Sequence, residues 1–182
     1  MLLLGLTALI VVVFSHEGDS EPTTKSYFMP AASMEPFIKA GDHFEAEVVD
    51  EYVPRRGDVI VFKDPGGWLS LDSHGGKLVK RVIGIPGDTI VCCDTEGRLS
   101  INGEPVDESA FLKMDPGVDC AGPMTGDCDW TAGPVPDDGL FVMGDNRANS
   151  ADSTVHLCRD PARCEHPDDA YVPISLVIGI VK

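Results

Sequence analysis

The segment LVKRVIGIPGD, residues 78–88, decides the fold of this chain. Side chains on a β-strand alternate between two faces, so Lys80 shares a face with Leu78 and Val82, while Arg81 shares the other with Val79. The Pro-Gly-Asp turn at 86–88 ends the strand. One of the two cations must therefore face apolar surroundings, unless the strand lies at a sheet edge and the lysine extends to solvent.

Short apolar segments bounded by turns lie on both sides of this strand. They predict further strands at 44–48, 59–62, 89–93, 99–101, 141–143 and 172–181. Asn102-Gly103 is a pair favoured in two-residue hairpin turns. No sustained helical period follows residue 14, so we expect a mainly β fold with two antiparallel β-sheet subdomains.

Composition and charge limit the class of protein. The 182 residues are 43% hydrophobic and 24% charged, which is typical of one globular domain with a small appendage. A net charge of −16 would repel a phosphate backbone, so nucleic acid is excluded as a partner. The acidity itself is interpreted as a solubility surface.

Residues 1–15 are predicted to be a short hydrophobic membrane anchor. The uncharged run 2–14 would reach only about 20 Å as a helix, short of the ~30 Å hydrocarbon core. A cleaved signal peptide is the alternative, but a basic n-region is missing. The polar residues 16–26 are predicted to be a linker. No basic cluster follows the anchor, which predicts a single-pass protein of the cell membrane with its catalytic domain on the extracytoplasmic side.

The six cysteines indicate an oxidising compartment, because none forms a C-x-x-C metal or redox motif. Cys120 and Cys128 are eight residues apart and could close a short loop. The six-residue spacing of Cys158 and Cys164 allows the same.

The adjacent Cys92 and Cys93 should point to opposite faces of a strand, so they are predicted not to pair with each other, and one cysteine is left free. Zinc bound by His156, Cys158, Cys164 and His166 is the less favoured alternative, so no metal is predicted.

Three polar clusters could carry chemistry. Ser33 lies in MPAASMEP, residues 29–36, between two prolines and beside small residues that would let a substrate approach. A buried Lys80 would have a lowered pKa and could act as a general base without histidine. The segment GDNRANSADS, residues 144–153, predicts a hydrogen-bonded loop in which Asp145 and Arg147 pair and Ser150 holds the lysine amine.

Taken in order, these clusters resemble the boxes of the type I signal peptidases, a family of membrane-anchored Ser/Lys serine proteases. Residues 30–36 with Gly41-Asp42 are similar to the nucleophile box, and 56–62 to the next strand. Residues 80–88 resemble the lysine box, and 144–153 the last box. The resemblance runs from about Tyr27 to Ser153.

The resemblance implies an endopeptidase that removes signal peptides from exported preproteins, cutting after small residues (Ala-X-Ala). Ser33 would be the nucleophile and oxyanion N–H donor, Lys80 the base, and Ser150 the residue that orients Lys80. Structural support would come from Asp145, Arg147 and Asp152. A catalytic β domain of residues 27–90 and 139–182 would carry an inserted subdomain of residues 91–138. No cofactor is implied, and the partners would be preproteins and membrane lipid, with the chain a monomer.

Three positions depart from the family pattern. Ala31 replaces a serine whose hydroxyl donates to the oxyanion in many members, and such a donor contributes roughly 10²–10³ in rate. Thr154 stands where an arginine often follows Asp-Ser, and Ala148 where an acidic residue is common. Two alternative functions follow: a Ser/Lys peptidase dedicated to one partner, and an inactive, disulfide-bonded extracellular binding module.

Overall fold

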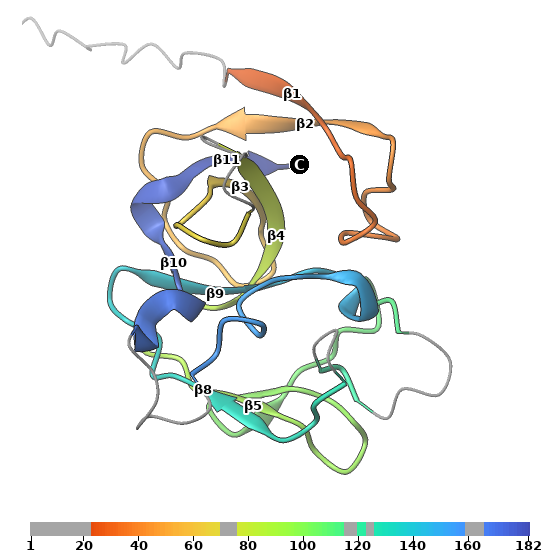
Figure 1. Ribbon diagram of the computed structural model, residues 1–182, viewed down its shortest axis with the longest axis vertical. Helices are drawn as coiled ribbons and strands as arrows, with labels where there is room; N and C mark the ends of the chain where they lie inside the picture. The colour runs from red at the N-terminus through yellow and green to blue at the C-terminus, as the bar shows by residue number, and fades with distance from the viewer. Residues whose placement is uncertain (1–22, 70–75, 115–119, 123–125, 159–165) are drawn as a thin grey trace, which may run out of the picture.

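The computed structural model describes residues 23–69, 76–114, 120–122, 126–158 and 166–182, and its strands form two antiparallel sheets (Figure 1). The larger sheet has the order β1-β2-β11-β3-β4-β9-β10. Its strands are β1 (Thr24–Phe28), β2 (His43–Val48), β3 (Val59–Lys63), β4 (Lys77–Gly84), β9 (Gly139–Met143), β10 (Val172–Pro173) and β11 (Val177–Val181).

The smaller sheet is formed entirely by strands that lie between β4 and β9 in the sequence. Its order is β7-β6-β5-β8, with β5 (Ile90–Cys92), β6 (Ser100–Ile101), β7 (Glu104–Pro105) and β8 (Trp130–Ala132). In Figure 1, β5 and β8 lie at the bottom of the molecule, below the larger sheet. Three short 3₁₀ helices, η1 (Arg147–Asn149), η2 (Pro167–Ala170) and η3 (Ile174–Leu176), complete the described elements.

Strands β4 and β9 form the centre of the fold. Every residue of β9 and every residue of β4 except Lys77 is buried. Val82 and Val142 pair in register across the two strands and pack in one apolar cluster with Phe62. On the other side, Phe141 and Met143 pack with the apolar residues of the smaller sheet. Burial on both faces explains why β9 is a continuous apolar run rather than an alternating one.

The mainly β expectation is confirmed, and so is the hairpin at Asn102-Gly103. Both turn residues have positive φ, 54° and 85°, and the turn joins β6 to β7. The interior position of β4, between β3 and β9, overturns the edge-strand alternative for Lys80.

Three element boundaries differ from expectation. Strand β1 begins at Thr24, inside the segment predicted to be a linker, and pairs with β2. The single strand expected at 172–181 is divided into β10, η3 and β11. Strand β8 lies in the loop-rich stretch, where no strand was expected.

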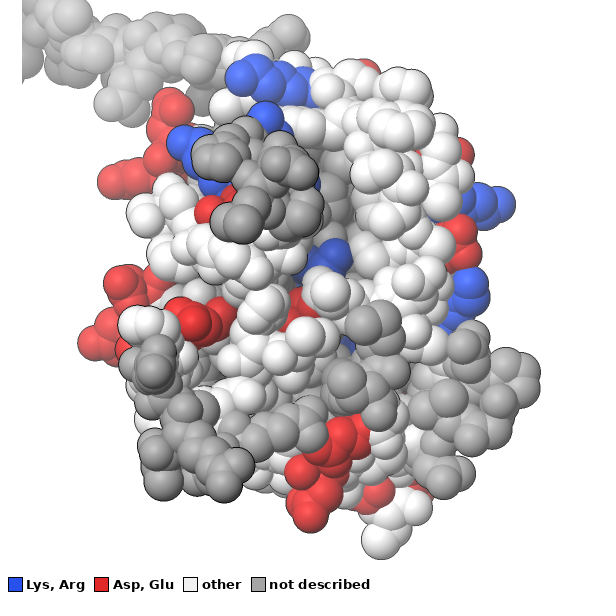
Figure 2. Space-filling view, in the orientation of Figure 1, with Lys and Arg blue, Asp and Glu red and all other residues white. Residues whose placement is uncertain are grey.

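The predicted anchor, residues 1–15, lies outside the described residues. Within the described part of the chain, no helix has the length and apolar character needed to cross a membrane. On the face in Figure 2, Asp and Glu side chains gather in several separate clusters, in keeping with the net charge of −16.

Candidate active site

Ser33 lies in the loop that connects β1 to β2. Two hydrogen bonds close the base of this loop, from Met29 N to Asp42 O at 2.9 Å and from Gly41 N to Met29 O at 2.8 Å. Met34, the next residue after Ser33, is completely buried in an apolar cluster with Met29. Because the loop is fixed at both places, Ser33 itself is held with only 7% of its surface exposed.

Lys80 projects from the interior strand β4 to the Ser33 hydroxyl. Its Nζ lies 3.0 Å from Ser33 Oγ and 3.1 Å from the carbonyl oxygen of Val79, and the residue is 5% exposed. Among the described residues, no carboxylate lies within ion-pair distance of this amine. Burial lowers the pKa of Lys80 below its ordinary value of 10.5, and the negative charges of Asp152 and Asp145 oppose that shift.

Arg81, the next residue on β4, is buried as well, at 8% exposure. Its guanidinium makes two hydrogen bonds to the Asp145 carboxylate, at 2.7 and 2.6 Å, and a third to Gly57 O at 2.7 Å. It also lies 4.1 Å from the centre of the Phe111 ring. Lys80 and Arg81 are therefore both buried, but among the described residues only Arg81 is paired with a carboxylate.

Asp152 organises the loop that follows β9. Its carboxylate accepts hydrogen bonds from Gly144 N at 3.0 Å and from Ser150 Oγ at 2.6 Å. The backbone N–H and hydroxyl of Thr154 donate to its other oxygen, at 3.1 and 2.6 Å. Thr154, which departs from the family pattern, thus supports Asp152 through hydrogen bonds instead of an ion pair.

Ser150, expected to hold the lysine amine, donates its hydrogen bond to Asp152 instead. In the described part of the chain, the bonds of Lys80 Nζ go to Ser33 and to the Val79 carbonyl. Ser150 nevertheless lies next to the β1–β2 loop that carries Ser33, called the nucleophile loop below because it resembles the nucleophile box. A methyl group placed on Gly144 would lie 2.3 Å from Ser150 Oγ and 2.4 Å from Ser33 O. Ser150 therefore packs against Gly144, which in turn packs against Ser33.

The expected pair of Asp145 with Arg147 is wrong, because each side chain has another partner. Asp145 binds Arg81, and the Arg147 guanidinium binds both oxygens of Glu108. Arg147 also donates to Gly144 O at 3.1 Å and to the carbonyl of Ala121. Glu108 belongs to the segment between β7 and β8, 39 residues from Arg147, and no sequence signal marked it.

The buried pair of Glu108 and Arg147 gives a test of stability. Each side chain is 3% exposed, so removing the carboxylate would leave an uncompensated buried cation. We expect Glu108→Ala to lower the free energy of unfolding by about 3–5 kcal/mol, measured by urea denaturation. Glu96→Ala, which removes an exposed carboxylate beside Arg98, is the matched control and should leave the midpoint unchanged. Equal effects of the two substitutions would contradict the assignment.

Asn146 and Lys113 join the two loops of the site. Asn146 donates its backbone N–H to Ser33 O at 3.1 Å and its side-chain amide to Ala32 O at 3.0 Å. The Lys113 ammonium lies 2.8 Å from Glu35 Oε2, and its backbone pairs with Asp145 and Arg147. Neither residue was singled out from the sequence as part of the site.

The cysteines correct one expectation. Cys120 and Cys128 form the expected disulfide, but Cys92 and Cys93 are bonded to each other. The peptide bond between them is cis and brings their Cα atoms to 3.0 Å, whereas the alternation argument assumed a trans bond. No cysteine is free in the described part of the chain, and Cys158 is disulfide-bonded, while Cys164 lies outside the described residues.

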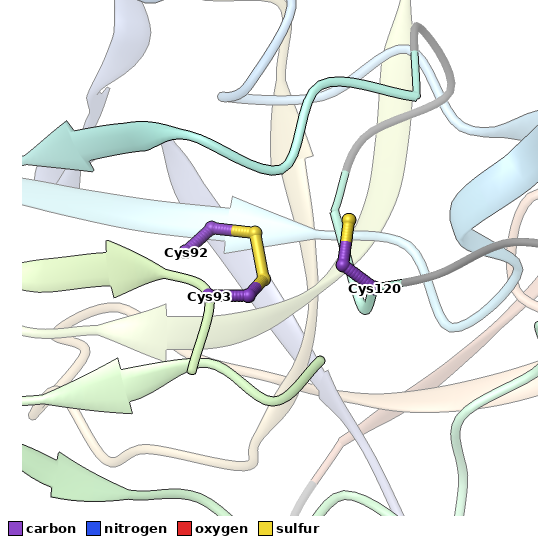
Figure 3. Close-up of side chains that lie close together, drawn as sticks. All are labelled: Cys92, Cys93 and Cys120. Atoms are coloured by element: carbon purple, nitrogen blue, oxygen red, sulfur yellow. A yellow bond between two sulfur atoms is a disulfide. The ribbon is translucent and has the colours of Figure 1, made fainter. Parts of the chain in front are cut away.

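Metal-ligating side chains come close together at one place among the described residues. The Sγ atoms of Cys92, Cys93 and Cys120 lie within 4.8 Å of one another (Figure 3). All three are in disulfides and offer no thiolate to a metal ion.

Comparison with known proteins places this chain in a family. The family model described as signal peptidase, peptidase S26, matches residues 1–182. The chain belongs to this signal peptidase family. It is 36% identical to signal peptidase I of Leptolyngbya laminosa over 129 residues, which cover 69% of this chain and 57% of the relative. It is 33% identical to signal peptidase I of Mycobacterium tuberculosis, with 85% of this chain and 62% of the relative covered.

The chain spans about three fifths of the length of these curated relatives. A crystal structure of a signal peptidase I from Enterococcus faecalis is 24% identical and has a TM-score of 0.42, covering 72% of this chain and 99% of that one.

Proposed function

We propose that this signal peptidase family member is a membrane-bound serine endopeptidase that removes signal peptides from exported preproteins after an Ala-X-Ala site. The observation that carries the proposal is the contact between Lys80 Nζ and Ser33 Oγ, 3.0 Å, with both residues buried. Ser33 Oγ attacks the carbonyl carbon of the scissile peptide bond, and Lys80 takes the hydroxyl proton. Lys80 then delivers this proton to the leaving amine, and water releases the acyl group from Ser33.

The oxyanion that forms in this step needs a hydrogen-bond donor. In the described part of the chain, the backbone N–H of Ser33 donates to no other group, so it is available for this role. Asn146 anchors the carbonyls of Ala32 and Ser33 and so supports the orientation of that N–H. Support for the site is indirect. Asp145 binds Arg81, Arg147 binds the Gly144 carbonyl, and Asp152 accepts hydrogen bonds from Gly144 and Ser150.

Cleavage of a preprotein in detergent micelles tests the proposal. We expect the wild-type protein to cut after the second Ala of an Ala-X-Ala site, as shown by mass spectrometry of both products. Ser33→Ala should produce no cut. Cleavage at the same site by Ser33→Ala would overturn the assignment. Processing of one preprotein but not of several unrelated ones would favour the dedicated peptidase instead.

The pH dependence follows from the burial of Lys80. The neutral amine is the active base, so kcat/KM should rise with pH along a limb whose apparent pKa lies below 10.5. The charge of Asp152 raises the pKa of Lys80, so Asp152→Asn should move this limb to lower pH. Glu96→Gln, at an exposed turn, is the control and should leave the limb in place. A limb at or above 10.5, or a shift to higher pH in Asp152→Asn, would contradict the role of Lys80.

Ala31 gives a prediction of increased activity. The residue is exposed and lies two positions before Ser33, where it offers no hydroxyl. We expect Ala31→Ser to supply an oxyanion donor and to raise kcat by up to roughly 10²-fold, with KM unchanged. Ala31→Val, which adds bulk without a hydroxyl, should not raise kcat. Equal rates for the serine variant and the wild type would show that another group already fills this role.

A further inference from the structure

Two disulfides meet at the end of strand β5. The sulfurs of Cys92 and Cys93 lie within 4.8 Å of the Cys120 sulfur, although Cys120 is bonded to Cys128 (Figure 3). Gly122 packs against both bridges, since a methyl group on it would lie 3.0 Å from Cys120 Sγ and 3.4 Å from Cys92 Sγ. A small movement of one side chain would therefore bring a sulfur of one bridge into contact with the other.

The two bridges are oriented alike with respect to solvent. Cys92 and Cys120 are each 2% exposed, whereas Cys93 and Cys128 are only half-buried. A thiol from solution can therefore reach Cys128, and the sulfur expelled from the bridge is the buried Cys120. Disulfide exchange proceeds by attack of a thiolate on a neighbouring disulfide sulfur. The Cys120 thiolate would be formed beside the Cys92–Cys93 bond.

We propose that these four cysteines form a thiol–disulfide exchange site whose external reactant is a dithiol. One thiolate of the dithiol attacks Cys128 Sγ, forms a mixed disulfide there and expels the Cys120 thiolate. Cys120 attacks Cys92 Sγ, which forms a Cys92–Cys120 disulfide and releases Cys93 as a thiolate that takes a proton from water. The second thiol of the dithiol then resolves the mixed disulfide and leaves Cys128 as a thiol. The protein gains two electrons and two protons, and the dithiol becomes a disulfide.

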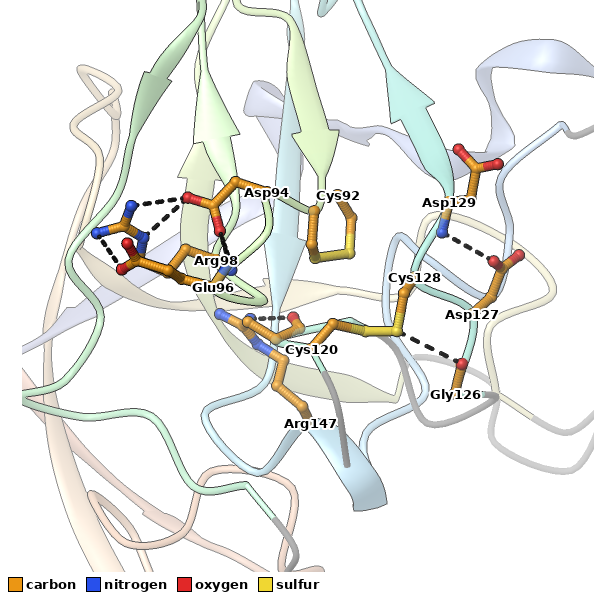
Figure 4. Close-up of a disulfide and its surroundings, with 12 residues drawn as sticks. Cys92, Asp94, Glu96, Arg98, Cys120, Gly126, Asp127, Cys128, Asp129 and Arg147 are labelled. Atoms are coloured by element: carbon orange, nitrogen blue, oxygen red, sulfur yellow. Dashed lines mark hydrogen bonds and ion pairs between the residues drawn. A yellow bond between two sulfur atoms is a disulfide. The ribbon is translucent and has the colours of Figure 1, made fainter. Parts of the chain in front are cut away.

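Hydrogen bonds connect this cluster to the proposed catalytic site. Ala121, the neighbour of Cys120, accepts a hydrogen bond at its carbonyl from Arg147. Figure 4 shows Arg147 together with the Cys120–Cys128 bridge. Arg147 also holds Gly144 O, and Gly144 packs on Ser33. Movement of Cys120 toward Cys92 would displace the Ala121 carbonyl from Arg147 and loosen the 144–147 loop. The rearranged form should therefore cleave preproteins more slowly, an effect that rests on the proposed function.

The exchange itself is tested without any activity measurement. In Cys128→Ser, Cys120 is a free thiol beside the Cys92–Cys93 bond, and exchange needs no external reductant. After incubation at pH 8, alkylation and peptide mapping should find Cys92 linked to Cys120 and Cys93 alkylated. Cys120→Ser, which leaves the half-buried Cys128 thiol instead, is the matched control and should retain the Cys92–Cys93 bond. An intact Cys92–Cys93 bond with alkylated Cys120 in folded Cys128→Ser would overturn the proposal.

The wild-type protein gives a second test that is independent of how the variants fold. Limiting dithiothreitol, followed by acid quenching and mapping, should yield a species with a Cys92–Cys120 link and alkylated Cys93 and Cys128. Loss of the two bridges independently, with no such species, would overturn the proposal. Preprotein cleavage should fall as this species accumulates, and an unchanged rate would overturn the coupling. If the oxidised protein cleaves no preprotein but the Cys92–Cys120-linked form still appears, the proposed function is wrong and the exchange site is supported.

Discussion

Replacing Lys80 with methionine should abolish preprotein cleavage while leaving the fold intact. Methionine fills nearly the same volume without a proton acceptor, so we expect kcat/KM to fall on the order of 10⁴-fold or more. Stability should not fall, because Lys80 is 5% exposed and forms no ion pair among the described residues. An apolar side chain there is no harder to bury than an amine. Thermal unfolding and cleavage of the same samples measure the two effects together.

Lys77→Met is the matched control, because Lys77 is the exposed first residue of the same strand. It should retain the wild-type rate. The double variant Ser33→Ala with Lys80→Met should be no slower than either single variant, because a nucleophile and its base act as one unit. Additive losses, or near-normal cleavage by Lys80→Met, would show that another group removes the Ser33 proton.

The second large effect is expected at Gly144. A methyl group there would lie 2.3 Å from Ser150 Oγ and 2.4 Å from Ser33 O, far closer than atoms can approach. Gly144→Ala must therefore push the nucleophile loop and the 144–153 loop apart. We expect a loss of roughly 10²-fold in kcat, since a displacement of about 1 Å at a reacting group has effects of this size. Overpacking should also lower the free energy of unfolding by about 1–3 kcal/mol.

Gly139→Ala is the control for the loss of a glycine, because Gly139 is the first residue of β9, the strand that ends just before Gly144. Its methyl group would contact Tyr171 Cβ at 3.2 Å, at the end of β9 away from the loop. Small adjustments of side chains can relieve this contact, so activity should be close to that of the wild type. Equal losses in the two variants would place the effect of Gly144→Ala in strand stability rather than in the site.

Local signals accounted for much of the fold. Short apolar segments bounded by turns predicted the strands of the larger sheet from β2 onward, although 172–181 was expected as one strand, and Asn102-Gly103 predicted its turn. Both signals are short-range features of the chain. Strand β1 was not predicted, because only Tyr27 of its five residues is even partly buried and its sequence shows no alternation of apolar and polar residues. Its strand form comes from hydrogen bonding to β2, which no local pattern reports.

The residues of the candidate site were likewise predicted only where local sequence marked them. Ser33 and Lys80 were found because their neighbours form recognisable boxes, and the contact between them joins residues 47 positions apart. Glu108 and Lys113 were missed because each is a single charged residue in a loop, and its role depends on which distant partner the fold supplies. The Asp145 and Arg147 pairing failed for that reason too: proximity in sequence favoured it, but buried partners from other segments were available to both.

The separation of these segments along the chain has a consequence for refolding. The nucleophile loop joins β1 and β2, two neighbouring strands at the edge of the larger sheet. Strand β4, which carries Lys80, pairs with β9, and all strands of the smaller sheet lie between these two in the sequence. Contacts between distant residues form late, because long loops must close first. The proposed proteolytic activity should thus be the last property to return after dilution from denaturant, later than secondary structure and compaction. With the proposed activity returning last, partly folded molecules would be unable to cleave one another.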